Sequence, residues 1–167
     1  LLENRGIFMK APESAPEELQ ESLSKIFHRQ IFPVLTPMAI DPTHPFPFLY
    51  SRTLNILYRL SSETRNEKQA IVPVPGILPR FYLVEHSRKK WVFLIEDLIS
   101  FFSEDLFPGY RILEKQVFRI TRNADLSVDE EGNEDLLKTI KDQLKERKRG
   151  SVVRLQLQNP GEEYLTR

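Results

Sequence analysis

Apolar residues in the first part of the chain follow two different spacings. Residues 7–9 are a short apolar run, which predicts a strand. A stripe with helical spacing comes next, separated by polar positions, and consists of Leu19, Leu23, Ile26 and Phe27. Ser14 and Glu17 have the spacing of a capping box, with Pro16 inside the first turn. We therefore expect a helix that begins here and ends near Gln30.

The middle of the chain alternates β-prone runs with polar loops. Residues 54–60 and 70–74 form one candidate antiparallel pair, and residues 81–84 and 91–95 form a second. Pro73 has no amide hydrogen to donate, so it belongs at a sheet edge or at a strand end. The pattern predicts a sheet that grows by hairpins.

Two further helices are predicted. The first opens with the acids Glu96 and Asp97, which suit the helix dipole, and its apolar face consists of Leu98, Ile99, Phe102 and Leu106. We expect it to continue to the Pro108-Gly109 stop. The second runs from a cap at about Asn133 to the cationic residues 145–149.

Strands at residues 112–113, 117–121 and 153–157 complete the pattern. In residues 117–121, Phe118 and Ile120 alternate with Val117, Arg119 and Thr121. Hairpins interspersed with helices, without regular β-α alternation, indicate an α+β fold. We expect a mainly antiparallel sheet built from hairpins and packed with about three helices.

A proline-rich stretch follows the first helix. Eight of the 12 prolines lie between Pro33 and Pro79, and fixed φ angles exclude a helix interior there. We expect a stiff loop that buries His44 and holds Phe46 and Phe48 against the core, because a solvated linker has little use for such rings.

Composition narrows the class of protein. The chain has 167 residues, which suits one domain, and its 24 basic residues balance its 24 acidic ones. Zero net charge argues against a general nucleic-acid binder, although a local basic patch stays open. The absence of cysteine excludes disulfides and weakly favours an intracellular protein, and no apolar run is long enough to span a bilayer.

Motifs that carry chemistry are scarce. The six glycines are isolated, so no phosphate-binding loop is formed, and the histidines His28, His44 and His86 show no metal-binding or nucleophile spacing. We assign all three structural roles. Two acidic pairs, at 96–97 and 104–105, are better explained by the helix dipole and by solvation than by a divalent ion. The cations at 145–149 suit a helix end, with an anionic ligand or partner as the alternative.

Arginines on predicted strands are the remaining candidates. Arg119, Arg122 and Arg154 must face solvent or find a partner, and a guanidinium fork binds phosphate as well as carboxylate. Surface or ion-pair roles are the simpler explanation. From the residues alone, the chain is an α+β domain without an evident catalytic centre.

Several motifs, in order along most of the chain, resemble the middle or head domain of bacterial polyphosphate kinase. They are Pro33-Val34-Leu35-Thr36-Pro37, Ile40-Asp41-Pro42, His44-Pro45-Phe46-Pro47, Val74-Pro75-Gly76, Leu78-Pro79-Arg80-Phe81, Glu96-Asp97-Leu98-Ile99, Leu106-Phe107-Pro108-Gly109 and residues 118–126. Residues 1–8 also resemble the junction at which the helical N-terminal domain of that family ends. The opening residues look like the last turn of a helix and no initiator Met precedes them, so we expect an internal piece of a longer protein.

The resemblance implies domain boundaries within the chain and a location for the catalytic residues outside it. Residues 1–10 would end a preceding domain or junction, 11–160 would form the head, and 161–167 would begin a linker. The whole protein would add a helical N-terminal domain and two phospholipase-D-like C-terminal domains, form a homodimer, and use ATP and magnesium to extend polyphosphate. The phosphorylated histidine, the metal ligands and most of the ATP pocket would lie outside the head, so no catalytic, cofactor or metal residue is assigned here.

Three functions follow as hypotheses. The first is a scaffolding and dimerising domain that is inactive when isolated, within a polyphosphate kinase in the cytoplasm or at the membrane periphery. The second is a polyphosphate- or nucleotide-binding module that uses Arg80, Arg119, Arg122 and Arg154, with a salt-dependent affinity. The third is a protein-interaction domain of unrelated function.

Overall fold

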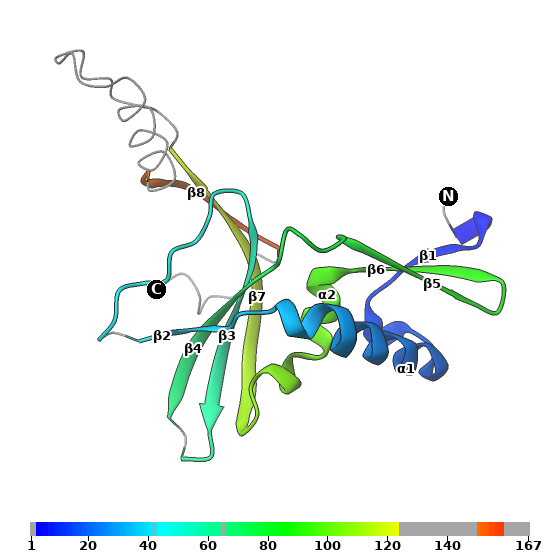
Figure 1. Cartoon of the computed structure of the whole chain (residues 1–167), viewed down its shortest axis with the longest axis horizontal. Helices are drawn as coiled ribbons and strands as arrows, with labels where there is room; N and C mark the ends of the chain where they lie inside the picture. The colour runs from blue at the N-terminus through cyan, green and yellow to red at the C-terminus, as the bar shows by residue number, and fades with distance from the viewer. Residues whose placement is uncertain (1–2, 42, 65, 124–149, 159–167) are drawn as a thin grey trace, which may run out of the picture.

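The computed structural model describes residues 3–41, 43–64, 66–123 and 150–158. The helix predicted from Asn133, the cations at 145–149 and the linker at 161–167 lie outside these residues. The described part contains two β-sheets with helices between them (Figure 1). The α+β prediction is confirmed, but the strands divide into two sheets instead of one.

The larger sheet has five strands, and all neighbouring pairs are antiparallel. Their order across the sheet is β2 (Met38–Ile40), β4 (Glu67–Pro73), β3 (Leu54–Ser62), β7 (Tyr110–Arg122) and β8 (Val152–Leu157). The predicted hairpin of β3 and β4 is confirmed, and Pro73 stands at the end of its strand. The two segments expected at 112–113 and 117–121 are one long strand, β7.

The smaller sheet has the order β1 (Ile7–Met9), β6 (Lys89–Leu94) and β5 (Phe81–His86). The β5–β6 hairpin is antiparallel as predicted, whereas β1 pairs with β6 in parallel, from Ile7 opposite Lys90 to Met9 opposite Val92. The N-terminal segment thus adds an edge strand to a hairpin that lies about 80 residues later in the chain.

Helices fill the space beside the sheets. They are α1 (Glu17–Ile26), which continues as a π-helical turn (Phe27–Ile31) and a 3-10 turn (Phe32–Val34), and α2 (Ile95–Phe101), followed by a 3-10 turn (Ser103–Leu106). Short 3-10 turns also cover Glu3–Arg5 and Pro12–Ser14. None of the described helices is long and apolar enough to cross a membrane.

Two apolar clusters hold the layers together. The main core joins the inner faces of α1, α2 and both sheets, and its fully buried members include Leu23, Phe27, Ile56, Phe93 and Leu98. A smaller cluster on the opposite face of the five-stranded sheet consists of Leu49, Ile71, Phe118 and Ile120. The alternation read in residues 117–121 thus places Phe118 and Ile120 in this cluster.

Two details of the predicted helices are wrong. Ser14 does not cap α1, because it belongs to the preceding 3-10 turn; Pro16 occupies the N-cap position without a side-chain hydrogen bond. The helix from Glu96 is also not continuous to Leu106, since α2 ends at Phe101. Ser103 Oγ donates to the carbonyl oxygen of Ser100 at 2.7 Å, which is the kind of local bond that competes with helix continuation.

The phenylalanine and histidine side chains of the proline-rich loop lie outside the core, contrary to prediction, although Leu49 of the same loop is buried. Phe46 and Phe48 are 63% and 44% exposed, and the His44 side chain is also exposed. Phe48 is held at the surface by an edge contact with Tyr50, at 5.3 Å between ring centroids, and by the guanidinium of Arg122 at 4.9 Å. Surface cation–π packing replaces the burial that the sequence suggested.

Candidate functional site

Arg80 is engaged with a buried carboxylate. Its Nη2 donates to Glu96 Oε1 at 2.6 Å, and Glu96 is only 3% exposed at the start of α2. The backbone carbonyl of Arg80 also accepts from the amide of Ile95 at 3.0 Å. The other Glu96 oxygen, Oε2, is buried without a hydrogen bond in the described part of the chain. This pair therefore fixes the segment before β5 against α2.

Arg122 acts as a tie between three segments. Its Nε donates to the carbonyl of Leu49 at 3.0 Å and its Nη1 donates to the carbonyl of Gly150 at 2.9 Å. Its backbone amide donates to Ser51 Oγ at 3.0 Å. A Cβ at Gly150 would lie 2.2 Å from the Asn123 carbonyl oxygen, so the close approach requires glycine there.

Arg119 and Arg154 occupy one face of neighbouring strands. Arg119 of β7 stands opposite Gln156 of β8, and Thr121, two residues further along β7, stands opposite Arg154. Residues two apart in a strand share a face, which places both arginines on the same side. Of the four predicted anion contacts, these two are brought together, while Arg80 and Arg122 have the internal partners described above. A role in anion binding stays a prediction for all four.

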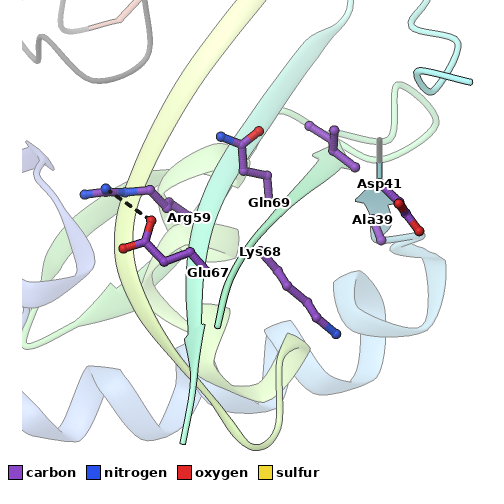
Figure 2. Close-up of a pocket in the computed structure, with 7 residues that line it drawn as sticks. Ala39, Asp41, Arg59, Glu67, Lys68 and Gln69 are labelled. Carbon is purple, nitrogen blue, oxygen red and sulfur yellow. Dashed lines mark ion pairs between the residues drawn. The ribbon is translucent and has the colours of Figure 1, made fainter. Parts of the chain in front are cut away.

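A pocket of about 520 Å³ lies over the edge of the five-stranded sheet and is lined by Ala39, Ile40, Asp41, Arg59, Glu67, Lys68 and Gln69. Arg59 pairs with Glu67 at 3.6 Å and with Glu114 of β7 at 3.1 Å. Figure 2 shows Arg59 and Glu67 pointing toward one another, while Lys68 extends away from them. Lys68 donates to the Tyr110 hydroxyl at 3.0 Å.

Titration in this pocket follows from the same contacts. A hydrogen bond from the Thr43 backbone amide to Asp41 Oδ1 lowers the pKa of that carboxyl, and the Tyr110 hydroxyl raises the pKa of Lys68. Both groups are thereby held in their charged forms. Arg59 pairs with carboxylates, Lys68 with the Tyr110 hydroxyl and Asp41 with Thr43, so the pocket contains both signs of charge and each charged group has a partner.

His28 sits between a serine and an aspartate in an arrangement that resembles a hydrolase triad. Its Nδ1 lies 3.3 Å from Ser24 Oγ, and its Nε2 lies 3.1 Å from Asp105 Oδ2. However, Nδ1 also lies 2.8 Å from the Ser24 carbonyl oxygen, which only accepts, so Nδ1 carries a proton and donates. A protonated Nδ1 cannot take the proton of the serine hydroxyl. His28 is a structural link from the end of α1 to the turn at Ser103–Leu106.

The acidic pairs have separate environments. Glu96 is buried with Arg80, whereas Glu104 and Asp105 are exposed on the 3-10 turn, so the two pairs do not share one helix. Burial raises the pKa of the Asp97 carboxyl, and the neighbouring Glu96 and Glu13 charges add to that effect. Over the described ranges, His, Asp and Glu side chains do not gather into groups of three or more that would hold a metal ion.

Two polar arrangements escape sequence reasoning. One is the cluster of Arg59, Glu67 and Glu114, whose members come from three strands. The other is a pair of lysines, Lys10 and Lys89, whose ammonium groups lie 5.8 and 5.2 Å from the centroid of one Phe8 ring. Neither set has a local spacing that would reveal it, because strand pairing brings its members together.

Comparisons with known proteins agree with each other. The family model for the polyphosphate kinase middle domain matches residues 18–167. Polyphosphate kinase of Staphylococcus saprophyticus is 47% identical over 146 residues, covering 87% of this chain and 20% of the relative. Polyphosphate kinase of Bacillus anthracis is 43% identical over 170 residues, covering 98% of this chain and 24% of the relative.

The fold gives the same answer. A crystal structure of polyphosphate kinase from Porphyromonas gingivalis matches with a TM-score of 0.65 and 27% identity, covering 71% of this chain and 20% of that one. The chain thus spans about a fifth to a quarter of the length of these relatives. Because the family model, the sequence relatives and the fold coincide over most of its length, the chain belongs to the polyphosphate kinase family and corresponds to its middle domain.

Proposed function

We propose that this chain is the scaffolding and dimerising domain of a polyphosphate kinase that works in the cytoplasm or at the membrane periphery. The whole protein transfers the terminal phosphate of ATP to polyphosphate, using magnesium and a phosphohistidine located outside this segment. In this proposal residues 1–10 form the junction with a helical N-terminal domain, residues 11–160 form the head, and residues 161–167 lead toward phospholipase-D-like domains.

The proposal rests on one observation: the charged and polar side chains at the candidate sites link secondary-structure elements to one another. Arg80 and Glu96 fix α2, Arg122 ties the proline-rich loop to β7, and His28 links α1 to the turn after α2. These groups stabilise tertiary structure, which is what a support domain requires.

An apolar surface on the smaller sheet supports an assembly role. Phe81 pairs across the hairpin with Leu94, and Leu83 pairs with Val92, so these side chains share the face that points away from Trp91 and the core. Phe81 and Leu83 are 58% and 57% exposed. An exposed apolar sheet face of this kind is typical of a surface that another domain or subunit covers.

Activity of the isolated chain tests the first half of the proposal. The 167-residue chain, incubated with ATP and magnesium, is expected to form no polyphosphate, while the full-length enzyme does so under the same conditions. Sustained ATP-dependent polymer synthesis by the chain alone would show that catalysis resides in it.

Assembly tests the second half. In the full-length protein, Leu83→Glu should lower the dimer fraction measured by sedimentation, because a charge would be buried in the contact. Leu155→Glu, which changes an equally exposed leucine (54%) on β8, is the matched control. Equal dimer fractions for the wild type and Leu83→Glu would contradict the assignment of this face.

A further inference from the structure

One end of the molecule concentrates positive charge although the chain as a whole is neutral. We define the cationic hairpin surface as five exposed residues contributed by the β1 segment and by the β5–β6 turn: Arg5, Lys10, Arg88, Lys89 and Lys90. This surface wraps around the end of the sheet, because Lys90 shares a face with Leu83 whereas Lys89 shares the opposite face with Trp91. The parallel pairing of β1 with β6 brings the two groups together, and the Lys90 amide donates to the Gly6 carbonyl at 2.8 Å. The zero net charge of the whole chain therefore does not reveal that basic residues gather at this end.

Carboxylates neutralise only part of this surface. Glu3 lies 3.8 Å from Lys10 and Glu85 lies 3.8 Å from Lys90, and all four side chains are well exposed. Exposed pairs of this length contribute little free energy and exchange easily for another anion. Within the described ranges Arg5, Arg88 and Lys89 form no ion pair. The acidic residues in the first turn of α1, Glu17 and Glu18, also form no ion pair with any cation of this surface.

The centre of the surface holds two ammonium groups close to one ring. Lys10 and Lys89 both approach Phe8, and Phe8 in turn stacks on Trp91 with 5.1 Å between ring centroids. The ring attracts each cation, and the strand register places Lys89 before Phe8 and Lys10 beyond it, because Phe8 stands opposite Trp91. A chain of phosphates that runs past Phe8 would accept hydrogen bonds from both ammonium groups.

The turn itself retains a cation at a conformational cost. Ser87 and Arg88 have φ angles of 51° and 60°, the left-handed conformation for which a two-residue hairpin favours Asn-Gly. A non-glycine residue held in this region costs about 1 kcal/mol or more, and such strain collects at functional positions. The hairpin thus has a positively charged arginine at its tip, at a position where glycine would adopt the same φ angle with less strain.

We propose that the cationic hairpin surface binds inorganic polyphosphate. The proposal rests on the proposed function, which supplies a linear polyanion as the substrate class. Spaced point charges on flexible stems suit a repeating chain of phosphates, because each contact adds salt-dependent affinity without requiring a shaped pocket. The Phe8 ring is occupied by Trp91 and the lysines, so it offers no platform on which a nucleic-acid base would stack.

Direct binding to the 167-residue chain tests this assignment. The probe is end-labelled polyphosphate of defined length, followed by fluorescence anisotropy at several salt concentrations. Lys10→Ala/Lys89→Ala is expected to weaken binding about tenfold and to reduce the slope of log affinity against log salt by about one to two. Lys25→Ala/Arg29→Ala, at exposed positions of α1 and of the π-helical turn that continues it, removes the same charge and should leave affinity within about twofold.

Two further arms decide the outcome. Lys10→Arg/Lys89→Arg should restore binding to near the wild-type level, and circular dichroism should show unchanged folding for every variant. Equal affinities of Lys10→Ala/Lys89→Ala and Lys25→Ala/Arg29→Ala would overturn the proposal. So would equally tight binding of single-stranded DNA or of anionic lipid vesicles through the same lysines, because the surface would then be a general anion contact.

Failure here is distinguishable from failure of the proposed function. If the cationic hairpin surface does not bind polyphosphate, the lysine variants will bind it as tightly as the wild type, and the activity and dimer assays will still give the results expected for a support domain. Failure of the support role would instead appear as polymer synthesis by the isolated chain, or as no response of the dimer fraction to Leu83→Glu.

Discussion

Glu96 places a carboxylate in the core, and its partner reaches it from the rim. At the residue scale this is the most direct case in which a charged side chain stabilises tertiary structure, since Glu96 is 3% exposed while the Arg80 side chain is half exposed. A buried charge deprived of its partner keeps its desolvation penalty without compensation. The asymmetry between the two residues yields a measurable prediction.

Arg80→Ala should lower the free energy of unfolding by about 2–4 kcal/mol, because Glu96 is left charged and unpaired in the core. Arg80→Ala/Glu96→Gln should recover part of that loss, since the amide carries no charge. Urea denaturation measures both variants. Arg111→Ala, at an exposed position on β7, serves as the control and should stay within about 0.5 kcal/mol of wild type. A double variant less stable than Arg80→Ala would contradict this account.

Asp97 gives a pH-dependent prediction. Burial, Glu96 and Glu13 raise the pKa of its carboxyl in the folded state, so between its unfolded and folded pKa values the native protein binds more protons than the unfolded one. Its contribution to stability is therefore present at low pH and is lost as pH rises through the raised pKa. Asp97→Asn should be more stable than wild type at pH 7, and the difference should shrink toward zero on acidification. If the stability difference between Asp97→Asn and wild type grew on acidification, the raised pKa of Asp97 would be contradicted.

At the element scale, the β5–β6 hairpin combines a regular ladder with a strained turn. Six residue pairs, from Phe81 opposite Leu94 to His86 opposite Lys89, join its strands. The ladder tolerates two left-handed residues because the cross-strand bonds and the core face hold both strands in register. Folding stability therefore favours Asn-Gly at positions 87 and 88, whereas the proposed polyphosphate contact requires the charge of Arg88.

Ser87→Asn/Arg88→Gly should raise the free energy of unfolding by about 0.5–1 kcal/mol, because Asn-Gly adopts the required turn with less strain. The same variant should bind polyphosphate more weakly than wild type. Thermal unfolding and anisotropy provide the two measurements. Gly109→Ala, at a φ of 81°, is the converse control and should be destabilising. A destabilised Asn-Gly variant would show that the turn is not strained.

At the scale of the whole molecule, one core joins both sheets. Phe93 of the three-stranded sheet and Ile56 of the five-stranded sheet belong to the same buried cluster as α1 and α2. A shared core couples the unfolding of the layers that contribute to it. The single tryptophan, Trp91, lies in β6 and reports on the smaller sheet.

Ile56→Ala should therefore shift the Trp91 fluorescence transition and the circular dichroism transition together, at a cost of about 2–5 kcal/mol. Phe93→Ala, in the other sheet, should also move both probes, by about 3–5 kcal/mol. Denaturation followed by both signals tests the coupling. If Ile56→Ala moved only the circular dichroism signal, the sheets would be independent units.

Much of the local structure was predictable because it depends on local signals. Runs of β-prone residues predicted β5 and β6, alternating apolar residues predicted β8, and the stripe from Leu19 to Phe27 predicted α1. The errors arose where tertiary contacts compete with such signals. Phe48 lies over Arg122 instead of in the core, and the helix after Glu96 stops where Ser103 binds the Ser100 carbonyl.

The amino-acid sequence by itself determined the α+β class, most strands, the first helix and the family, since these follow from periodicity and from ordered motifs. Only the tertiary structure decided that there are two sheets, that β1 joins β6 in parallel, and that Arg80 is committed to Glu96. The physical reason is that strand pairing and ion pairing act between residues far apart in the chain, where no local spacing records them. The cationic hairpin surface is a product of the same long-range pairing.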